Sequence, residues 1–383
     1  MTTAEGTMNL LYAPLLREHG YALPMIGTLS GLFAVFQLIS RVPSGAAYRA
    51  ETSTRQRLIW LVVYALTTSG FYFVGGEPIA VVLLTMVHGY AFGAISTLNL
   101  AVIIDLTGGK RAGATMGWYT AALSAGYAAG AFLGGLLGDS FGIPIAIAIL
   151  GALPLLGVPL TVGTPAYEGV PRSREHGPGL RGLFRAHLRL DPRVWLAFLI
   201  VLYINLLSDA VDIFFPLYGL SIGVPLAASG ALKGLKSGAA TFIRFVSGGI
   251  LRYLDHRAVN VWGVVLFAVA TVLIPVVGGT PLLAGLFLAA GLSRGILRVT
   301  SAASIAELRA EGQDVGVASG VYNAGLDIGA IIGPALGGVL GAAFGLGPMF
   351  QIVACASVAL YFAAASLTRA GRKTLLVRGR PAG

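Results

Sequence analysis

The chain has 383 residues, of which 56% are hydrophobic and only 11% are charged, and its mean hydropathy is +0.81. Soluble domains carry about 25% charged residues, so this composition excludes an ordinary soluble protein and predicts an integral membrane protein. The net charge of +10 would otherwise suggest a nucleic-acid partner. The basic residues are concentrated in loops between apolar segments, however, so we expect no nucleic acid to bind.

Apolar segments of about 20 residues, the length of a helix that crosses the hydrocarbon core, recur along the whole sequence. Backbone polar groups in lipid must be hydrogen-bonded within the segment, so we predict helices. Twelve spans are predicted, at 1–16, 24–48, 58–76, 79–104, 113–138, 143–163, 194–218, 226–250, 259–277, 281–307, 316–340 and 346–368. Lys and Arg fill alternate loops, and the loops on the other side contain only Arg17. The positive-inside rule therefore predicts a multi-pass protein of the plasma or inner membrane with both termini cytoplasmic.

The two halves of the sequence are related by an internal repeat. Residues 113–142 align with 316–345 at an offset of 203 without a gap, and Gly27 and Gly31 match Gly230 and Gly234 at the same offset. Such self-similarity in an apolar chain is typical of duplicated transporter bundles. We predict an all-α integral membrane fold of two pseudo-symmetric six-helix bundles, 1–163 and 194–368. A basic cytoplasmic linker (164–193) joins them, and a basic cytoplasmic tail (369–383) follows.

The first predicted span is shorter than the others and includes Glu5 and Asn9. Two interpretations are open: the helix is genuinely abbreviated, or the start codon is assigned one or two turns too late. The repeat favours the second, because it places Met1 opposite Ile204, well inside the seventh span. We therefore expect a longer native N-terminus, which mass spectrometry of the native protein would detect.

The residue patterns of enzymes and metal sites are missing from the sequence. Cys355 is the only cysteine, which excludes a disulfide framework and a thiolate metal site. No metal-ligand cluster, activated nucleophile or phosphate-binding loop has the required spacing. We expect no enzyme activity, cofactor or metal. The expected partners are a small-molecule substrate, protons as the coupling ion and membrane lipid, bound by a monomer. The basic amphipathic segment 182–190 of the linker suits either a solvated linker or contact with anionic lipid.

Glycines four residues apart mark one face of the fifth and eleventh spans, which favours close helix packing. The eleventh span also contains Gly333-Pro334-Ala335-Leu336-Gly337-Gly338, and the fifth contains the same pattern with Ala131 in place of proline. With the two six-helix halves and the basic linker, these residues make the chain resemble the major facilitator superfamily over essentially its whole length. The residues at the end of the second span, Gly45 to Arg49, partly match that family's motif for the loop between the second and third spans. The resemblance implies a secondary transporter, with conformational or packing roles for Gly45, Gly130, Gly134, Gly333, Pro334 and Gly337.

Charged residues inside the predicted spans are the candidates for a functional site, because each costs about 2.5–3.5 kcal/mol at mid-membrane. The second half contains five such cations and three acids: Lys233, Lys236, Arg244, Arg294, Arg298, Asp209, Asp212 and Asp327. Helical periodicity places them on stripes that we expect to face the bundle interior. The first half offers a milder wall, made of Glu5, Asn9, Tyr12, Gln37, His88 and Asn99.

We expect ion pairs among these charges. Lys233 and Lys236 are expected to pair with Asp209 and Asp212, and Asp327 with Arg294 or Arg298. Arg244 lies toward the cytoplasmic end of its span, where a long cation can reach the interface, so we interpret it as structural. The pairs either persist or open and close during transport.

The surplus of cations favours transport of a small organic anion by alternating access, coupled to protons. The expected substrate-binding residues are Lys233, Lys236, Arg294, Arg298, Asn205 and Asn323. The candidates for proton coupling or ion pairing are Asp209, Asp212, Asp327 and Glu5, since burial and neighbouring cations act in opposite directions on a carboxyl group. A proton-linked exporter of drug-like amphiphiles is the alternative. A non-transporting receptor is disfavoured because the loops are short.

Overall fold

The computed structural model describes residues 1–74, 76–107, 112–163, 191–250, 256–310 and 315–367. Within these ranges the chain forms helices joined by turns, and no strand is present. Of the predicted linker 164–193, only residues 191–193 are described, and the predicted tail 369–383 lies outside the described residues.

Each predicted span falls on a helix or a short series of helices. The first half contains α1 (Thr2–Glu18), α2 (Leu23–Ala47), η1 (Ala50–Thr52), α3 (Ser53–Val74), α4 (Pro78–Thr107), α5 (Ala112–Phe141), α6 (Ile143–Ala152), η2 (Leu153–Gly157) and α7 (Val158–Val162). The second half contains α9 (Pro192–Ser221), α10 (Leu226–Ile250), α11 (His256–Leu273), α12 (Thr280–Ala310), α13 (Val315–Phe344) and α14 (Leu346–Leu367). Pro154 and Pro159 interrupt the sixth span, because proline lacks the backbone donor that a helix needs. The predicted all-α membrane fold of twelve spans is confirmed.

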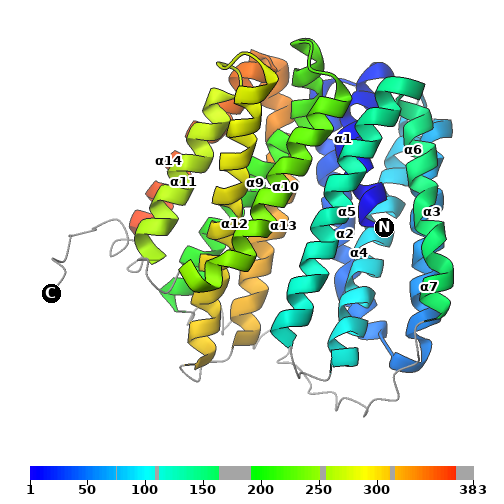
Figure 1. Cartoon of the computed structure of the whole chain (residues 1–383), viewed down its shortest axis with the longest axis horizontal. Helices are drawn as coiled ribbons and strands as arrows, with labels where there is room; N and C mark the ends of the chain where they lie inside the picture. The colour runs from blue at the N-terminus through cyan, green and yellow to red at the C-terminus, as the bar shows by residue number, and fades with distance from the viewer. Residues whose placement is uncertain (75, 108–111, 164–190, 251–255, 311–314, 368–383) are drawn as a thin grey trace, which may run out of the picture.

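Helix length and composition agree with a membrane location. Nine helices in the described part of the chain are long and apolar enough to cross a membrane. α10 is not among them because it carries Lys233, Lys236 and Arg244. α1 has 17 residues, against 30 in its repeat partner α9, and the N-terminus lies part-way along the bundle (Figure 1). The expected longer N-terminus stays a prediction.

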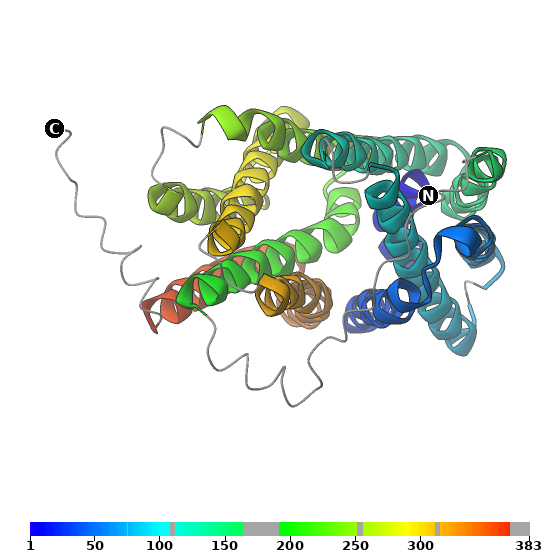
Figure 2. The same ribbon diagram turned by 90° about the horizontal axis from the view of Figure 1, so that it is seen from below.

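The two halves lie side by side and meet along two seams (Figures 1 and 2). One seam joins α2 to α13, and the other joins α5 to α10. A Cβ on Gly27 would collide with the carbonyl of Pro334, and a Cβ on Gly230 would collide with the carbonyl of Ala131. Gly230 is the repeat equivalent of Gly27, and Pro334 is the repeat equivalent of Ala131, each at the offset of 203. The sequence repeat is therefore also a repeat of the interface.

One inter-half contact on the α5–α10 seam has no counterpart on the other seam. The Asp139 carboxylate accepts hydrogen bonds from the backbone N–H groups of Leu226, at 3.1 Å, and Ala227, at 2.8 Å. An anion at a helix N-terminus satisfies unpaired N–H groups and the positive end of the helix dipole. Ala342 occupies the equivalent position in the second half. This contact ties the seam at the end opposite the predicted cytoplasmic side.

The seam between α5 and α10 does not continue toward the predicted cytoplasmic side. Gly234 of α10 still packs against Ala128 of α5, whereas a Cβ on Gly238, one turn further along, would meet no described atom within 4 Å. Trp118, near the start of α5, is 78% exposed. The halves are thus in contact at their outer ends and separate along α10 beyond Gly234.

Within the second half, α13 packs on α9 through its glycine face. A Cβ on Gly329 would lie 2.7 Å from the carbonyl oxygen of Leu202, and a Cβ on Gly333 would collide with the carbonyl oxygen of Leu206. In both cases the added Cβ would come closer to the carbonyl oxygen than an ordinary van der Waals contact allows. The spacing of four residues therefore lets the two backbones approach closely, as small residues do at helix interfaces in membranes.

Gly333→Val is expected to destabilise the protein by about 1–3 kcal/mol, because overpacking a close helix contact forces the backbones apart. Gly320→Val, on the same helix, is the matched control, since a Cβ at Gly320 meets no described atom within 4 Å. Thermal unfolding of the purified protein in detergent measures both. Equal melting temperatures for the two variants would contradict the packing role of Gly333.

Candidate functional site

A buried ion pair joins α9 to α10 in the second half. Lys236 Nζ lies 2.8 Å from Asp212 Oδ1 and donates a hydrogen bond of 2.9 Å to the Ser208 hydroxyl. That hydroxyl donates in turn to Asp212 Oδ2, at 3.1 Å. Ser208 and Asp212 share one face because they are four residues apart on a helix. Both carboxylate oxygens are occupied, and the Lys236 side chain is only 2% exposed, so this pair is fully enclosed.

Lys233 does not form the expected pair with a carboxylate. Its ammonium group donates to two backbone carbonyl oxygens, those of Asn9 and Asp212, each at 2.7 Å. The prediction was wrong because the Asp212 carboxylate is already taken by Lys236 and Ser208. Asp209, the other expected acid, makes no hydrogen bond or ion pair with any described residue, although the charges of Arg294, Lys236 and Arg298 act on it.

Asp327 pairs with a residue that sequence analysis did not consider for the site. Nη1 of Arg41 lies 2.9 Å from each carboxylate oxygen of Asp327. The expected pairing with Arg294 or Arg298 was wrong because the face of α13 that carries Asp327 packs against α2 of the other half rather than against α12. Arg41 lies inside the second predicted span, and its charge there was the available signal.

Three arginines of the second half interact electrostatically with one another. Arg294 and Arg298 on α12 are half-buried, and their charges act on Arg244 of α10. Arg298 also interacts with the Tyr322 hydroxyl, whereas the buried Nε of Arg294 has no hydrogen-bond partner among the described residues. Arg244 was expected to be structural, yet the structure brings it to the other two. The group of Arg244, Arg294 and Arg298 is called the arginine cluster below.

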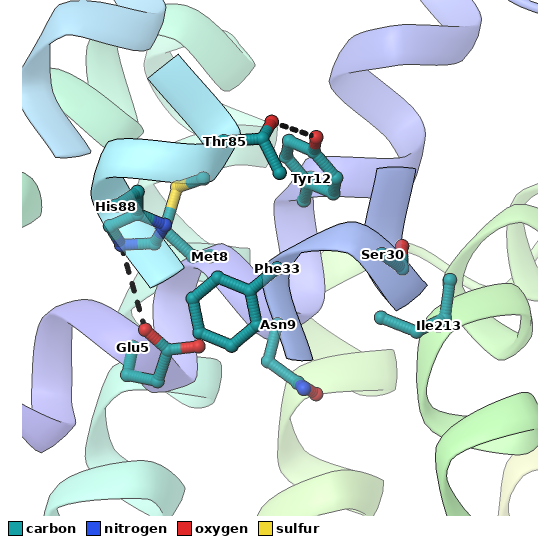
Figure 3. Close-up of a pocket in the computed structure, with 9 residues that line it drawn as sticks. All are labelled: Glu5, Met8, Asn9, Tyr12, Ser30, Phe33, Thr85, His88 and Ile213. Carbon is teal, nitrogen blue, oxygen red and sulfur yellow. Dashed lines mark hydrogen bonds and ion pairs between the residues drawn. The ribbon is translucent and has the colours of Figure 1, made fainter. Parts of the chain in front are cut away.

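The first half contributes a small cavity of about 60 Å³, shown in Figure 3. Its wall contains Glu5, Met8, Asn9, Tyr12, Ser30, Phe33, Thr85, His88 and Ile213. The volume holds a few water molecules or one small chemical group. All of these residues except Ile213 come from the first half, so the cavity lies where the two halves meet.

Glu5 is the one acid in the wall of this cavity. Its carboxylate accepts a hydrogen bond of 2.9 Å from the Tyr64 hydroxyl, and Oε2 lies 3.6 Å from His88 Nε2 (Figure 3). The His88 ring stacks on Tyr64, with ring centroids 5.0 Å apart. No lysine or arginine of the described chain lies within ion-pair distance of Glu5. Glu5 is therefore a buried carboxyl group with one neutral donor beside it.

Four polar residues that were named from the sequence lie outside this cavity wall: Asn205, Gln37, Asn99 and Asn323. Asn205 donates its amide to the carbonyl of Leu326, at 2.9 Å, and so ties α9 to α13. Asn323 is exposed, one turn from Asp327 on α13. Gln37 and Asn99 are half-buried and do not line the cavity. Only Glu5, Asn9, Tyr12 and His88 of the predicted first-half wall come together.

The sequence matches the family model of the Major Facilitator Superfamily over residues 1–280 and again over 250–381, which together cover nearly the whole chain. The chain belongs to the major facilitator superfamily. It is consequently a multi-pass membrane transporter of a small molecule and not an enzyme. No curated protein matches the sequence significantly.

Solved structures of two other transporters share the fold. The nucleoside transporter NupG superposes with a TM-score of 0.76 at 14% identity, over 98% of this chain and 96% of that one. A bacterial homologue of the human lysosomal transporter Spinster, in an inward-facing and unoccupied conformation, gives a TM-score of 0.75 at 14% identity, over 100% of this chain and 96% of that one. At this level of identity the likeness concerns the fold.

The residues that match superfamily motifs lie mostly at close helix contacts. Gly130 of α5 faces the Thr3 carbonyl, and a Cβ at Gly134 would lie 3.0 Å from the Thr7 side chain. Gly333 and Gly337 face α9, and Pro334 faces α2 across the seam. Gly45 differs, because the nearest atom to an added Cβ lies at 3.8 Å, an ordinary contact. The glycines of α5 and α13 therefore determine how closely the helices approach.

Proposed function

We propose that this superfamily member transports a small organic anion by alternating access, with protons as the coupling ion. The observation that carries the proposal is the arginine cluster. Arg244, Arg294 and Arg298 act on one another electrostatically, and the buried Nε of Arg294 lacks a hydrogen-bond partner among the described residues. Like charges held together at membrane depth are costly, and an anion bound between them relieves the repulsion.

The geometry favours arginines over lysines as substrate ligands. Lys236 is enclosed by Asp212 and Ser208, and Lys233 is only 6% exposed and bonded to carbonyl oxygens. Arg294 and Arg298 are only half-buried. A guanidinium group also binds a carboxylate through two parallel hydrogen bonds, which an ammonium group cannot do. A carboxylate-bearing substrate therefore suits this cluster, whereas a lipophilic cation would meet like charge.

Proton coupling is assigned to Glu5, with Asp209 as the second candidate. Neither carboxyl group forms an ion pair with a lysine or arginine among the described residues, and a buried carboxyl group that is not paired avoids the cost of burying its charge by holding a proton. The charges of Glu5, Asp209 and Arg294 all act on the Tyr127 hydroxyl of α5. This phenol is therefore within electrostatic range of both proton-binding candidates and of Arg294 of the arginine cluster. We also propose that the protein is a monomer in the plasma or inner membrane and that both of its termini are cytoplasmic.

Arg298→Gln and Arg294→Gln are each expected to weaken anion binding by at least about tenfold, because each removes a charge-assisted hydrogen bond. Binding is measured as the rise in melting temperature of the purified protein with a panel of mono-, di- and tricarboxylates, since a ligand that binds only the folded state stabilises it. Arg17→Gln is the charge-matched control, because Arg17 is exposed at the outer end of α1. Transport of a cationic dye by the parent protein that persists at the same rate in both cluster variants would refute the anion proposal.

A further inference from the structure

Lys233 contacts two residues that are equivalent in the internal repeat, one in each half of the protein. Its ammonium group donates to the carbonyl oxygens of Asn9 and Asp212, both at 2.7 Å. Asn9 and Asp212 are equivalent residues of the repeat, 203 positions apart, on α1 of the first half and α9 of the second. One side chain thus bonds the same backbone atom of both halves.

A proline explains why one of these carbonyls is available. In an α-helix the carbonyl of residue i accepts from the N–H of residue i+4. Residue 216 is proline and has no N–H, so the Asp212 carbonyl oxygen has no backbone donor within its helix. Such freed carbonyls in membrane helices are satisfied by other groups. The Lys233 ammonium supplies the missing donor.

The residue equivalent to Lys233 in the first half does not bridge the two halves. Ser30 occupies the position equivalent to Lys233 in the first half, and its hydroxyl bonds the Ile26 carbonyl of its own helix at 2.9 Å. Pro14 of α1 frees the carbonyl of Leu10, not that of Asn9. The Asn9 carbonyl accepts Lys233 with its second lone pair. This particular bridge between the halves therefore depends on Lys233 and is not repeated at the equivalent position.

We propose that Lys233 is a positioning residue that latches α1 to α9 and holds the outer ends of the halves together. Lys233 lies about 10 Å from the outer end of α10, at 1.5 Å per residue, on the side where the seams are closed. Asn9, whose carbonyl it binds, also lines the first-half cavity. Separation of the outer ends requires Lys233 to leave the Asn9 carbonyl, so the latch opposes the outward-open state.

The test measures outer-end separation without substrate. Ser140 of α5 and Pro225, next to the α10 residues that Asp139 binds, are both exposed. Both are replaced by cysteine in a Cys355→Ser background, and the rate of cross-linking with a short bifunctional reagent is measured in membranes. Lys233→Met is expected to shift the equilibrium between closed and separated outer ends about tenfold toward separation, because a hydrogen bond to a charged group is lost from the closed state only, and the cross-linking rate should fall with the closed fraction.

A second pair of variants keeps the lysine. Pro216→Ala supplies a backbone N–H that competes with Lys233 for the Asp212 carbonyl, so the ammonium group is held less firmly in position for the Asn9 carbonyl of the other half, and a drop in the cross-linking rate of about twofold or less is expected. Pro14→Ala is the matched control in α1, and its rate should equal that of the parent. An unchanged rate in Lys233→Met, or an equal drop in Pro14→Ala and Pro216→Ala, overturns the latch.

The latch rests on the alternating access of the proposed function but not on the nature of the substrate. Cross-linking is followed without any anion, so loss of the Lys233 effect and loss of carboxylate binding are separate results. If carboxylates fail to stabilise the protein while Lys233→Met still lowers cross-linking, the proposed substrate is wrong and the latch stands. If carboxylates stabilise the protein but Lys233→Met leaves the cross-linking rate unchanged, the latch is refuted and the proposed substrate stands.

Discussion

Lys236→Met is expected to destabilise the folded protein by about 3–5 kcal/mol, because it leaves a buried carboxylate without its cation. Asp212 is 8% exposed and has Ser208 as its remaining side-chain donor. Methionine is close to lysine in length and shape, so the expected loss comes from the charge rather than from packing. Thermal unfolding in detergent measures it.

The double variant Lys236→Met/Asp212→Asn is the control for this pair. Removing both charges is expected to cost less than removing one, because no uncompensated charge stays buried. The double variant should also keep its affinity for carboxylates, since the proposed substrate ligands are the arginines. Equal destabilisation of the single and double variants would show that Lys236 and Asp212 are not energetically coupled. Loss of carboxylate binding in the double variant would return Lys236 to the substrate site.

Glu5→Gln is expected to lower proton-driven accumulation of substrate at least about tenfold, because glutamine cannot take up and release a proton at this position. The substitution keeps the size of the side chain and an oxygen that accepts from Tyr64, so binding should persist. The measurement compares uptake into proteoliposomes under an imposed pH gradient with substrate exchange at equal pH on both sides. Exchange should stay within about twofold of the parent rate.

Glu18→Gln, on the same helix, is the matched control for Glu5, since Glu18 is exposed at the outer end of α1. It should accumulate substrate like the parent protein. Accumulation that survives in Glu5→Gln would remove Glu5 from the coupling mechanism and leave Asp209 as the candidate. Accumulation by the parent protein that ignores an ionophore would show that no proton gradient is used, and facilitated diffusion would replace coupled transport.

The two seams differ by a substitution that matters for the arginine cluster. Arg41 and Arg244 are repeat equivalents, and Asp327 in α13 corresponds to Ser124 in α5. On the α2–α13 seam, Arg41 pairs with Asp327. On the α5–α10 seam the equivalent position holds a serine, and the charges of Arg294 and Arg298 act on Arg244. Asp327 therefore gives the α2–α13 seam an ion pair with Arg41, whereas Ser124 at the equivalent position of α5 cannot form one.

The sequence alone determined the membrane location, the twelve spans and the duplication, because hydrophobic length and repeat spacing are properties of the chain itself. The enclosed pair of Lys236 and Asp212 was also predictable, since both residues face the interior at similar depth. Which charges meet across helices was decided by tertiary structure. Helix periodicity gives the face of a residue but not the helix that the face packs against.

For that reason the sequence paired Asp327 with α12, whereas the seam between halves pairs it with Arg41 of α2. It likewise expected Lys233 to meet a carboxylate, whereas folding brings its ammonium group to two equivalent carbonyl oxygens. Pro216 was visible in the sequence as a break in the backbone hydrogen bonding of α9. Only the tertiary structure, which brings Lys233 of α10 to the Asp212 carbonyl, showed which side chain fills that break.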